Sequence, residues 1–112
     1  MDILFDSKKF QKECKQQRLL IKRYGEVMAK RIGRRLDDLR AADNLETMRH
    51  LPGRCHELIG NRAGSLSLDL EHPYRLIFMP EHDPIPRKID GGLNWSQVTA
   101  VRIIRVEDTH DN

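Results

Sequence analysis

Three short stretches of the chain carry residue types that could together cleave a phosphodiester bond. Segment 51–64 places a histidine, His56, and several arginines among glycines. Arg75 lies in an alternating segment further along, and the stretch Glu107 to His110 supplies two carboxylates and a second imidazole. An imidazole can move a proton at the 2′-hydroxyl or the leaving oxygen of RNA, and a guanidinium can hold the phosphate. Brought together on a small sheet, these groups would bind and cleave a phosphodiester without a metal ion.

Length and composition predict one domain, residues 1–112, with a single modest core. Apolar residues make up 38% of the chain and charged residues 33%, which is typical of a soluble globular protein. No apolar run approaches the length of a membrane span, and no secretory signal is visible. Cys14 and Cys55 are far apart and lack the spacing of a metal site or redox motif. We therefore expect a cytoplasmic protein with no membrane contact, no metal and no other cofactor.

The positive charge is concentrated near the start of the chain. Residues 8–35 contain eleven lysines and arginines against two glutamates, whereas the whole chain has a net charge of only +3. Such a block attracts polyanions such as RNA, although a solvated basic helix face is an equally ordinary explanation. Candidate contacts with RNA or the ribosome, here and in later loops, are Lys8, Lys12, Arg31, Arg34, Arg62, Arg87 and Lys88.

The first forty residues predict a strand and two helices. The strand covers 2–5, and Asp6 or Ser7 is a suitable N-cap for a helix beginning at Lys8. Gly25 can end that helix and reverse the chain. The apolar stripe expected on the first helix is Phe10, Cys14, Gln17 and Ile21. The stripe expected on the second is Met28, Ile32, Leu36 and Leu39, with Arg31, Arg34, Arg35 and Asp38 on its other faces.

The second half of the chain predicts strands. After a short helical turn at 44–51, apolar residues alternate from Leu66 to Leu70 and again from Tyr74 to Phe78, around a turn at Pro73. Residues 80–97 are rich in proline and glycine and predict a long loop, and 99–106 predict the last strand. The order β-α-α-β-β-β indicates an α+β fold, in which both helices pack on one face of a small antiparallel sheet. Arg75 would then point onto the open face.

This order of segments resembles the plasmid-maintenance killer proteins, which form the HigB branch of the RelE/ParE superfamily of type II toxins. The resemblance covers residues 1–80 and 100–110, and it is sharpest in the run His56-Glu57-Leu58-x-Gly60-x-Arg62-x-Gly64. It implies a single RelE-like domain and a ribosome-dependent mRNA endoribonuclease that inhibits translation. It also implies neutralisation by a cognate helix-turn-helix antitoxin.

The resemblance further implies that His56, Arg75, Asp108 and His110 are the catalytic residues. Two positions depart from the family pattern. Thr109 stands where many relatives have tyrosine, and Ile59 stands where many have lysine. These replacements remove a ring that could stack on a base and a positive charge.

Two other classes of function remain open at this point. The ParE branch shares the fold but inhibits DNA gyrase, and a regulatory RNA-binding module could retain the scaffold without the activity. The Asp108-Thr109-His110 run favours the ribonuclease, whereas Thr109 and Ile59 leave the regulatory module possible. Trp95, in the long loop, could stack on a base but is more often the anchor of such a loop.

Overall fold

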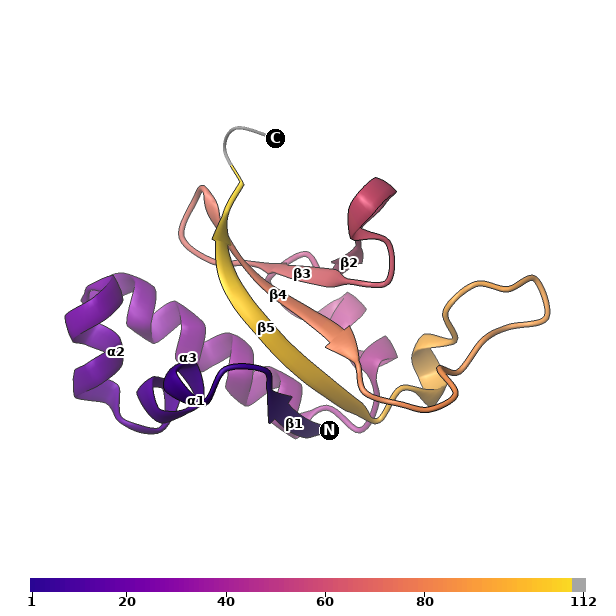
Figure 1. The fold of residues 1–112 in the computed structure, drawn as a ribbon, viewed down its shortest axis with the longest axis horizontal. Helices are drawn as coiled ribbons and strands as arrows, with labels where there is room; N and C mark the ends of the chain where they lie inside the picture. The colour runs from indigo at the N-terminus through magenta and orange to yellow at the C-terminus, as the bar shows by residue number, and fades with distance from the viewer. Residues whose placement is uncertain (110–112) are drawn as a thin grey trace.

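Five strands form one sheet in the computed structural model, which describes residues 1–109 (Figure 1). The order across the sheet is β1-β5-β4-β3-β2. The strands are β1 (Asp2–Phe5), β2 (His56–Glu57), β3 (Leu66–Asp69), β4 (Tyr74–Pro80) and β5 (Ala100–Asp108). The α+β fold expected from the sequence is confirmed.

The sheet is mixed, so the expectation of a wholly antiparallel sheet is wrong at one edge. Strand β1 pairs with β5 in parallel, and the other pairs are antiparallel. The first and last strands are far apart in sequence, so no tight turn between them imposes an antiparallel arrangement.

Three helices follow β1, one more than expected: α1 (Lys8–Lys15), α2 (Gln17–Tyr24) and α3 (Glu26–Ala41). Ser7 caps α1 as predicted, and its side chain accepts a hydrogen bond from the Phe10 amide at 3.1 Å. The extended backbone of Gln16 then divides the expected first helix into α1 and α2. Beyond this break Leu20 is buried, whereas Gln17 and Ile21 of the expected stripe are exposed, so the stripe predicted for one continuous helix is wrong in its second half.

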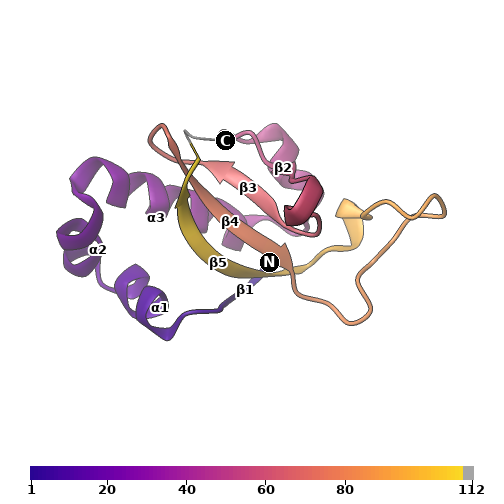
Figure 2. The same cartoon turned by 45° about the horizontal axis from the view of Figure 1, so that its top comes forward.

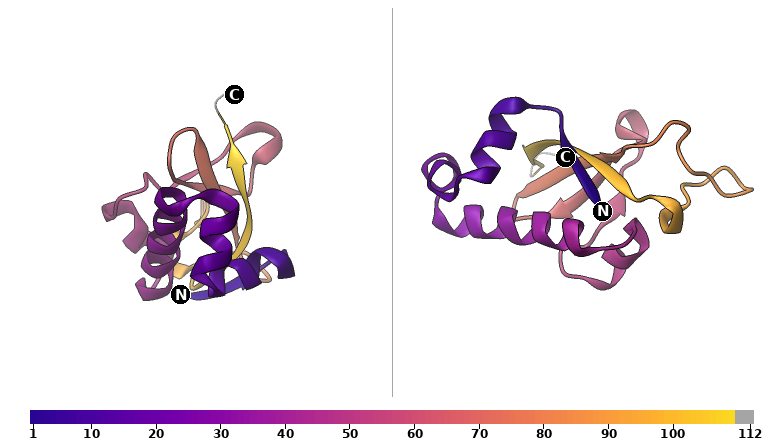
Figure 3. Two further views of the ribbon diagram at one scale, coloured as in Figure 1. Left: turned by 90° about the vertical axis from the view of Figure 1, so that its left-hand side faces the viewer. Right: turned by 90° about the horizontal axis from the view of Figure 1, so that it is seen from below.

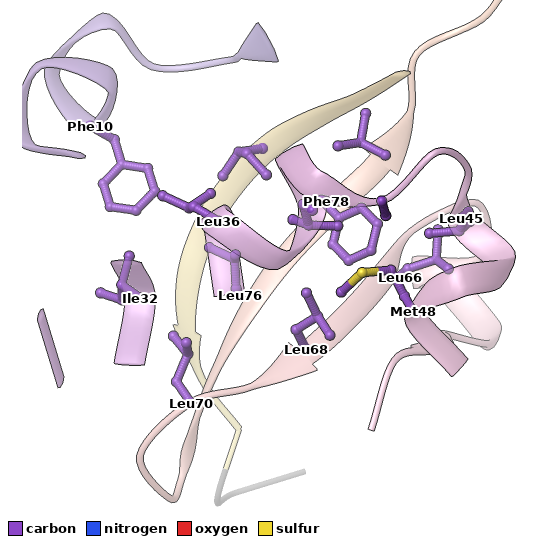
Figure 4. Packing of buried hydrophobic residues seen from close by; sticks show 14 of the residues in the cluster. Phe10, Ile32, Leu36, Leu45, Met48, Leu66, Leu68, Leu70, Leu76 and Phe78 are labelled. Carbon is purple, nitrogen blue, oxygen red and sulfur yellow. The ribbon is translucent and has the colours of Figure 1, made fainter. Parts of the chain in front are cut away.

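Helix α3 covers one face of the sheet (Figure 3). All four apolar residues of its expected stripe are buried, and they meet Leu66, Leu68, Leu76 and Phe78 from the sheet (Figure 4). Arg35 was expected on an outer face, but it is only 4% exposed. Its Nε donates to the carbonyl oxygen of Asp69 at 2.8 Å, so this arginine joins α3 to the end of β3. Burial lowers its pKa.

Within residues 1–109, three 3₁₀ helices complete the fold: η1 (Leu45–His50), η2 (Gly60–Arg62) and η3 (Trp95–Gln97). The first confirms the helical turn expected at 44–51. Residues 81–94 form a loop that extends away from the sheet, at the end opposite α1 and α2 (Figure 2). Among the helices within residues 1–109, none has the length and apolar character that a membrane span requires.

The core predicts a large cost for truncating Phe78, which is 0% exposed between α3 and the sheet. Phe78→Ala should lower the free energy of unfolding by about 3–5 kcal/mol, because it leaves a cavity among close-packed side chains. Val27→Ala on the exposed side of α3 is the matched control and should change stability by less than about 0.5 kcal/mol. Urea denaturation measures both. Equal effects of the two substitutions would contradict this packing.

Candidate functional site

A β-bulge in β5 decides which of its side chains reach the open face of the sheet. The register with β4 shifts between Ile77, which pairs with Arg105, and Phe78, which pairs with Ile103. The extra residue, Ile104, reverses the alternation of side chains beyond it. Arg105 and later Glu107 therefore lie on the face away from the helices.

Arg75 occupies the open face, as the sequence predicted. The next residue along β4, Leu76, belongs to the helix-facing core, so the side chain of Arg75 points to the opposite face. Across the sheet, Arg75 pairs with Asp69 on one side and with Glu107 on the other. Asp108 instead pairs with Tyr74, in the register position next to the pair of Arg75 and Glu107. The bulge thus places Glu107, and not the predicted catalytic residue Asp108, on the face of Arg75.

Asp69 holds two arginines together at the end of β3. Its carboxylate accepts hydrogen bonds from Arg54 Nε at 3.0 Å and Arg54 Nη2 at 3.4 Å, and Arg75 Nε lies 3.6 Å from Oδ1. The hydrogen bond with Asp69 raises the pKa of Arg54. We call Arg54, Asp69 and Arg75 the Asp69 triad. Formally it carries one unmatched positive charge.

The backbone before Arg54 fits closely against Arg35. Gly53 has a φ of +116°, and a Cβ at this position would lie 2.8 Å from Arg35 Nε. The Gly53 carbonyl also accepts a hydrogen bond from the Asp69 amide at 2.7 Å. Arg35 of α3 in turn donates to the Asp69 carbonyl oxygen. These two hydrogen bonds connect the backbone at Gly53 to the backbone at Asp69, and the backbone at Asp69 to α3.

Glu107 holds a second pair of arginines. Its Oε1 accepts a hydrogen bond from Arg105 Nε at 3.1 Å, and its Oε2 pairs with Arg62 Nη1. Arg62 comes from η2, between β2 and β3, whereas Glu107 lies on β5. The ion pair must therefore cross the open face over β3 and β4. We call Arg62, Glu107 and Arg105 the Glu107 triad, which also carries one unmatched positive charge.

His56 lies in the next row of the same face. His56 pairs with Ser67 on β3. Ser67 pairs with Ile77 on β4, which in turn pairs with Arg105 on β5. The Nδ1 of His56 is 2.8 Å from the carbonyl oxygen of Arg54. A neutral imidazole that donates from Nδ1 to this carbonyl leaves Nε2 as a proton acceptor. The structure thus brings His56, Arg75 and Arg62 onto one face.

A pocket of about 260 Å³ opens beside the Asp69 triad, at the turn between β3 and β4. Its lining includes Arg54, Asp69, His72, Tyr74, Arg75 and Thr109. Thr109 donates twice to the carbonyl oxygen of Pro73, from its amide at 3.1 Å and its hydroxyl at 2.9 Å. These bonds fix the last described residue at the rim of the pocket. His110, a predicted catalytic residue, lies outside the described residues.

The other predicted RNA contacts are dispersed. Arg31 on α3 pairs with Glu71 at 3.2 Å and so approaches the turn after β3. Lys8 and Lys12 lie on α1, and Arg34 lies on α3. Arg87 and Lys88 belong to the loop 81–94, and Arg87 lines a pocket with Leu58 and Gly64 on the two sides of η2. The structure does not bring these six lysines and arginines into the row of Arg75.

Trp95 anchors the long loop and is not available for stacking on a base. It is buried, its Nε1 donates to Glu57 Oε2 at 3.0 Å, and the Arg49 guanidinium lies 3.7 Å from the ring centroid. The anchoring interpretation of this residue is confirmed.

Sequence reasoning missed Arg54, Arg105 and Glu107 as members of the site. Arg54 stood inside the His56 segment, so its position in the sequence was a usable signal. Arg105 and Glu107 lie beyond the bulge, where simple alternation along the last strand no longer indicates the face. Within residues 1–109, no three histidine, cysteine or acidic side chains converge as metal ligands would.

Solved structures of bacterial toxins share this fold. A YoeB/ParE toxin from Agrobacterium tumefaciens aligns with a TM-score of 0.60 at 14% identity, over 98% of this chain and all of that one. The YoeB–YefM complex and the YoeB dimer from Staphylococcus aureus each give a TM-score of 0.56, at 15% and 17% identity, over 98% of both chains. No protein-family model and no curated protein matches the sequence. At these identities the likeness is one of fold.

The two cysteines are predicted to be inert in the native protein. Burial raises the pKa of both Cys14 and Cys55 to about 12, so on the order of one thiol in 10⁴ is ionised at pH 8. Native protein should react slowly with Ellman's reagent, and protein unfolded in guanidinium chloride should react at once. Because the folded pKa exceeds the unfolded value of 9.0, the linked stability is present below pH 9 and is lost as the pH rises toward 12. Fast labelling of native Cys55 would contradict the raised pKa of this partly buried thiol.

Proposed function

We propose that this protein is the toxin of a type II toxin–antitoxin pair and that it cleaves mRNA on the ribosome without a metal ion. The observation that carries this proposal is the convergence of His56 with two arginine–carboxylate triads on the open face. The shared fold of the YoeB and ParE toxins supports it. The resemblance of the His56 segment and the Asp108–His110 run points further to the HigB branch.

The proposed chemistry uses the substrate's own 2′-hydroxyl. His56 Nε2 accepts the proton of that hydroxyl, whose oxygen forms a bond to the adjacent phosphorus as the bond to the 5′-oxygen breaks. The leaving oxygen receives a proton from the second imidazole, which we assign to His110. Arg75 binds the non-bridging oxygens and stabilises the charge that develops on them. The products are a 2′,3′-cyclic phosphate and a 5′-hydroxyl.

Asp108 has a more limited part in this proposal than the resemblance implies. Its register places it with Tyr74, away from Arg75. It precedes His110 by two residues, so its proposed task is to orient that imidazole. Glu107 provides the carboxylate beside Arg75 and Arg105.

A protein partner is part of the proposal. One of the structures with this fold is a YoeB–YefM complex. By resemblance, the partner of this chain is a small helix-turn-helix antitoxin, and the proposed site of action is the ribosome in the cytoplasm.

Expression in cells tests the function directly. Induction of this protein alone should slow growth and translation, and a co-expressed antitoxin encoded beside it should restore both. Mapped mRNA fragments should carry 2′,3′-cyclic phosphates or the 3′-phosphates derived from them. Fragments with 3′-hydroxyls would overturn the chemistry. Inhibited gyrase with intact mRNA would move the protein to the ParE branch, and normal growth with abundant soluble protein would count against any toxin.

Substitution of the histidines tests whether both imidazoles take part in proton transfer. His110→Ala and His56→Ala should each reduce cleavage by roughly 10²–10⁴-fold, the range for a positioned proton-transfer group. His82→Ala, outside the open face, is the matched control and should leave cleavage unchanged. Single-turnover cleavage of ribosome-bound mRNA measures the effect, and thermal unfolding checks that each variant folds. If His110→Ala cleaves like the parent, the acid lies elsewhere. Full activity in both variants would reject the ribonuclease.

A further inference from the structure

We infer that the open face contains two phosphate sites, the Asp69 triad and the Glu107 triad, which bind two consecutive phosphates of one RNA strand. The inference rests on the proposed function, because it states how the proposed substrate is held. It assigns binding roles to Arg54 and Arg105, and positioning roles to Asp69 and Glu107.

The charges of the two triads match two phosphodiesters. In each triad, one carboxylate lies between two guanidinium groups, which leaves one positive charge. A phosphodiester carries one negative charge, so one phosphate at each triad completes a neutral set of four groups. A single phosphate would leave the positive charge of the other triad without a neutralising anion.

The carboxylates orient the arginines and leave donors for a ligand. A guanidinium has five N–H donors in a rigid plane. Within residues 1–109, the bonds to Asp69 use Nε and Nη2 of Arg54 and Nε of Arg75. Nη1 of Arg54 and both terminal nitrogens of Arg75 therefore remain for a phosphate. Because the arginines are held before binding, little conformational entropy is lost when the phosphate arrives.

The triads are close enough for neighbouring phosphates but are distinct sites. Asp69, Arg75 and Glu107 occupy one row across β3, β4 and β5. Two strand spacings separate the carboxylate-bearing residues, on the order of 10 Å between their Cα atoms. Arg54 contacts this row at Asp69 on β3, and Arg62 and Arg105 contact it at Glu107 on β5, so the two groups of arginines can bind adjacent phosphates of an extended strand. The bound RNA then runs across the strands, with His56 in the neighbouring row.

A competing surface lies on the helices. A cleft between α1 and α2 is lined by Lys9, Lys12, Lys22 and Arg23, with Glu13 among them. It has no histidine in its lining and is built from different elements than the row of Arg75. Attraction of RNA to this surface would be an outcome that excludes the two-triad site.

Binding of short oligonucleotides tests the inference without cleavage. Fluorescence anisotropy would compare labelled 2′-O-methyl RNAs with one, two and three phosphodiesters, since the methyl group blocks the 2′-oxygen. The second phosphate should increase affinity by about tenfold or more, because it adds charge-assisted hydrogen bonds. The third should add less than about threefold. Equal affinities for one and two phosphates would overturn the inference.

The salt dependence counts the phosphates bound. A slope of log K against log[salt] near −0.7 per phosphate predicts about −1.4 for the two-phosphate RNA. Arg54→Ala and Arg105→Ala should each halve that slope and weaken binding about tenfold, whereas Arg40→Ala, exposed on α3, should change neither. If Lys12→Ala reduces the slope and Arg54→Ala does not, the RNA binds at the helical cleft and the inference is wrong.

The two hypotheses fail in different ways. Two-phosphate binding that depends on Arg54 and Arg105, with ribosomal mRNA left intact, would reject the ribonuclease and support the two sites. Cleavage of mRNA that is unaffected by Arg54→Ala, with equal binding of one and two phosphates, would support the ribonuclease and reject the two sites.

Discussion

The extra residue in β5, Ile104, is the constraint on which the open face depends. Without the bulge, strict alternation after Ile103 would place Arg105 and Glu107 on the helix-facing side, where Val106 now lies. Charged groups in that layer would lose their hydration in an apolar core, at a large energetic cost. The bulge instead keeps Val106 toward the helices and gives the open face a carboxylate and an arginine. One irregular position thus satisfies both the core and the site.

The core and the site are also joined through Arg35. This side chain leaves α3, passes into the interior and bonds to the backbone of Asp69, beside the glycine that precedes Arg54. The ion pairs of the two triads are partly exposed, and such pairs add at most about 1 kcal/mol each to stability. Their main effect is to fix the directions of the guanidinium groups. The arrangement therefore fits the proposed binding of a phosphate better than a role in holding the fold together.

Much of the framework could be predicted from local patterns. Ser7 is a strong cap, the stripe of α3 has a clear helical period, and the alternation in β3 and β4 correctly placed Arg75. The break at Gln16 could not be predicted locally, because residues 14–18 contain no proline or glycine that would indicate it. The burial of Arg35 could not be predicted from the sequence either. An arginine that bonds to a buried carbonyl oxygen has the same local sequence pattern as one on the surface. Two triads that join β5 to η2 and β3 to the 51–55 turn depend on long-range register, which no local pattern supplies.

The central claim is that the bulge builds a site for two phosphates on the open face. A crystal structure of the protein with the two-phosphate 2′-O-methyl RNA tests it most directly. The account predicts one phosphate against Arg54 and Arg75, the next against Arg62 and Arg105, and a 2′-oxygen beside His56. RNA bound along α1 and α2, with no phosphate at either triad, would contradict it.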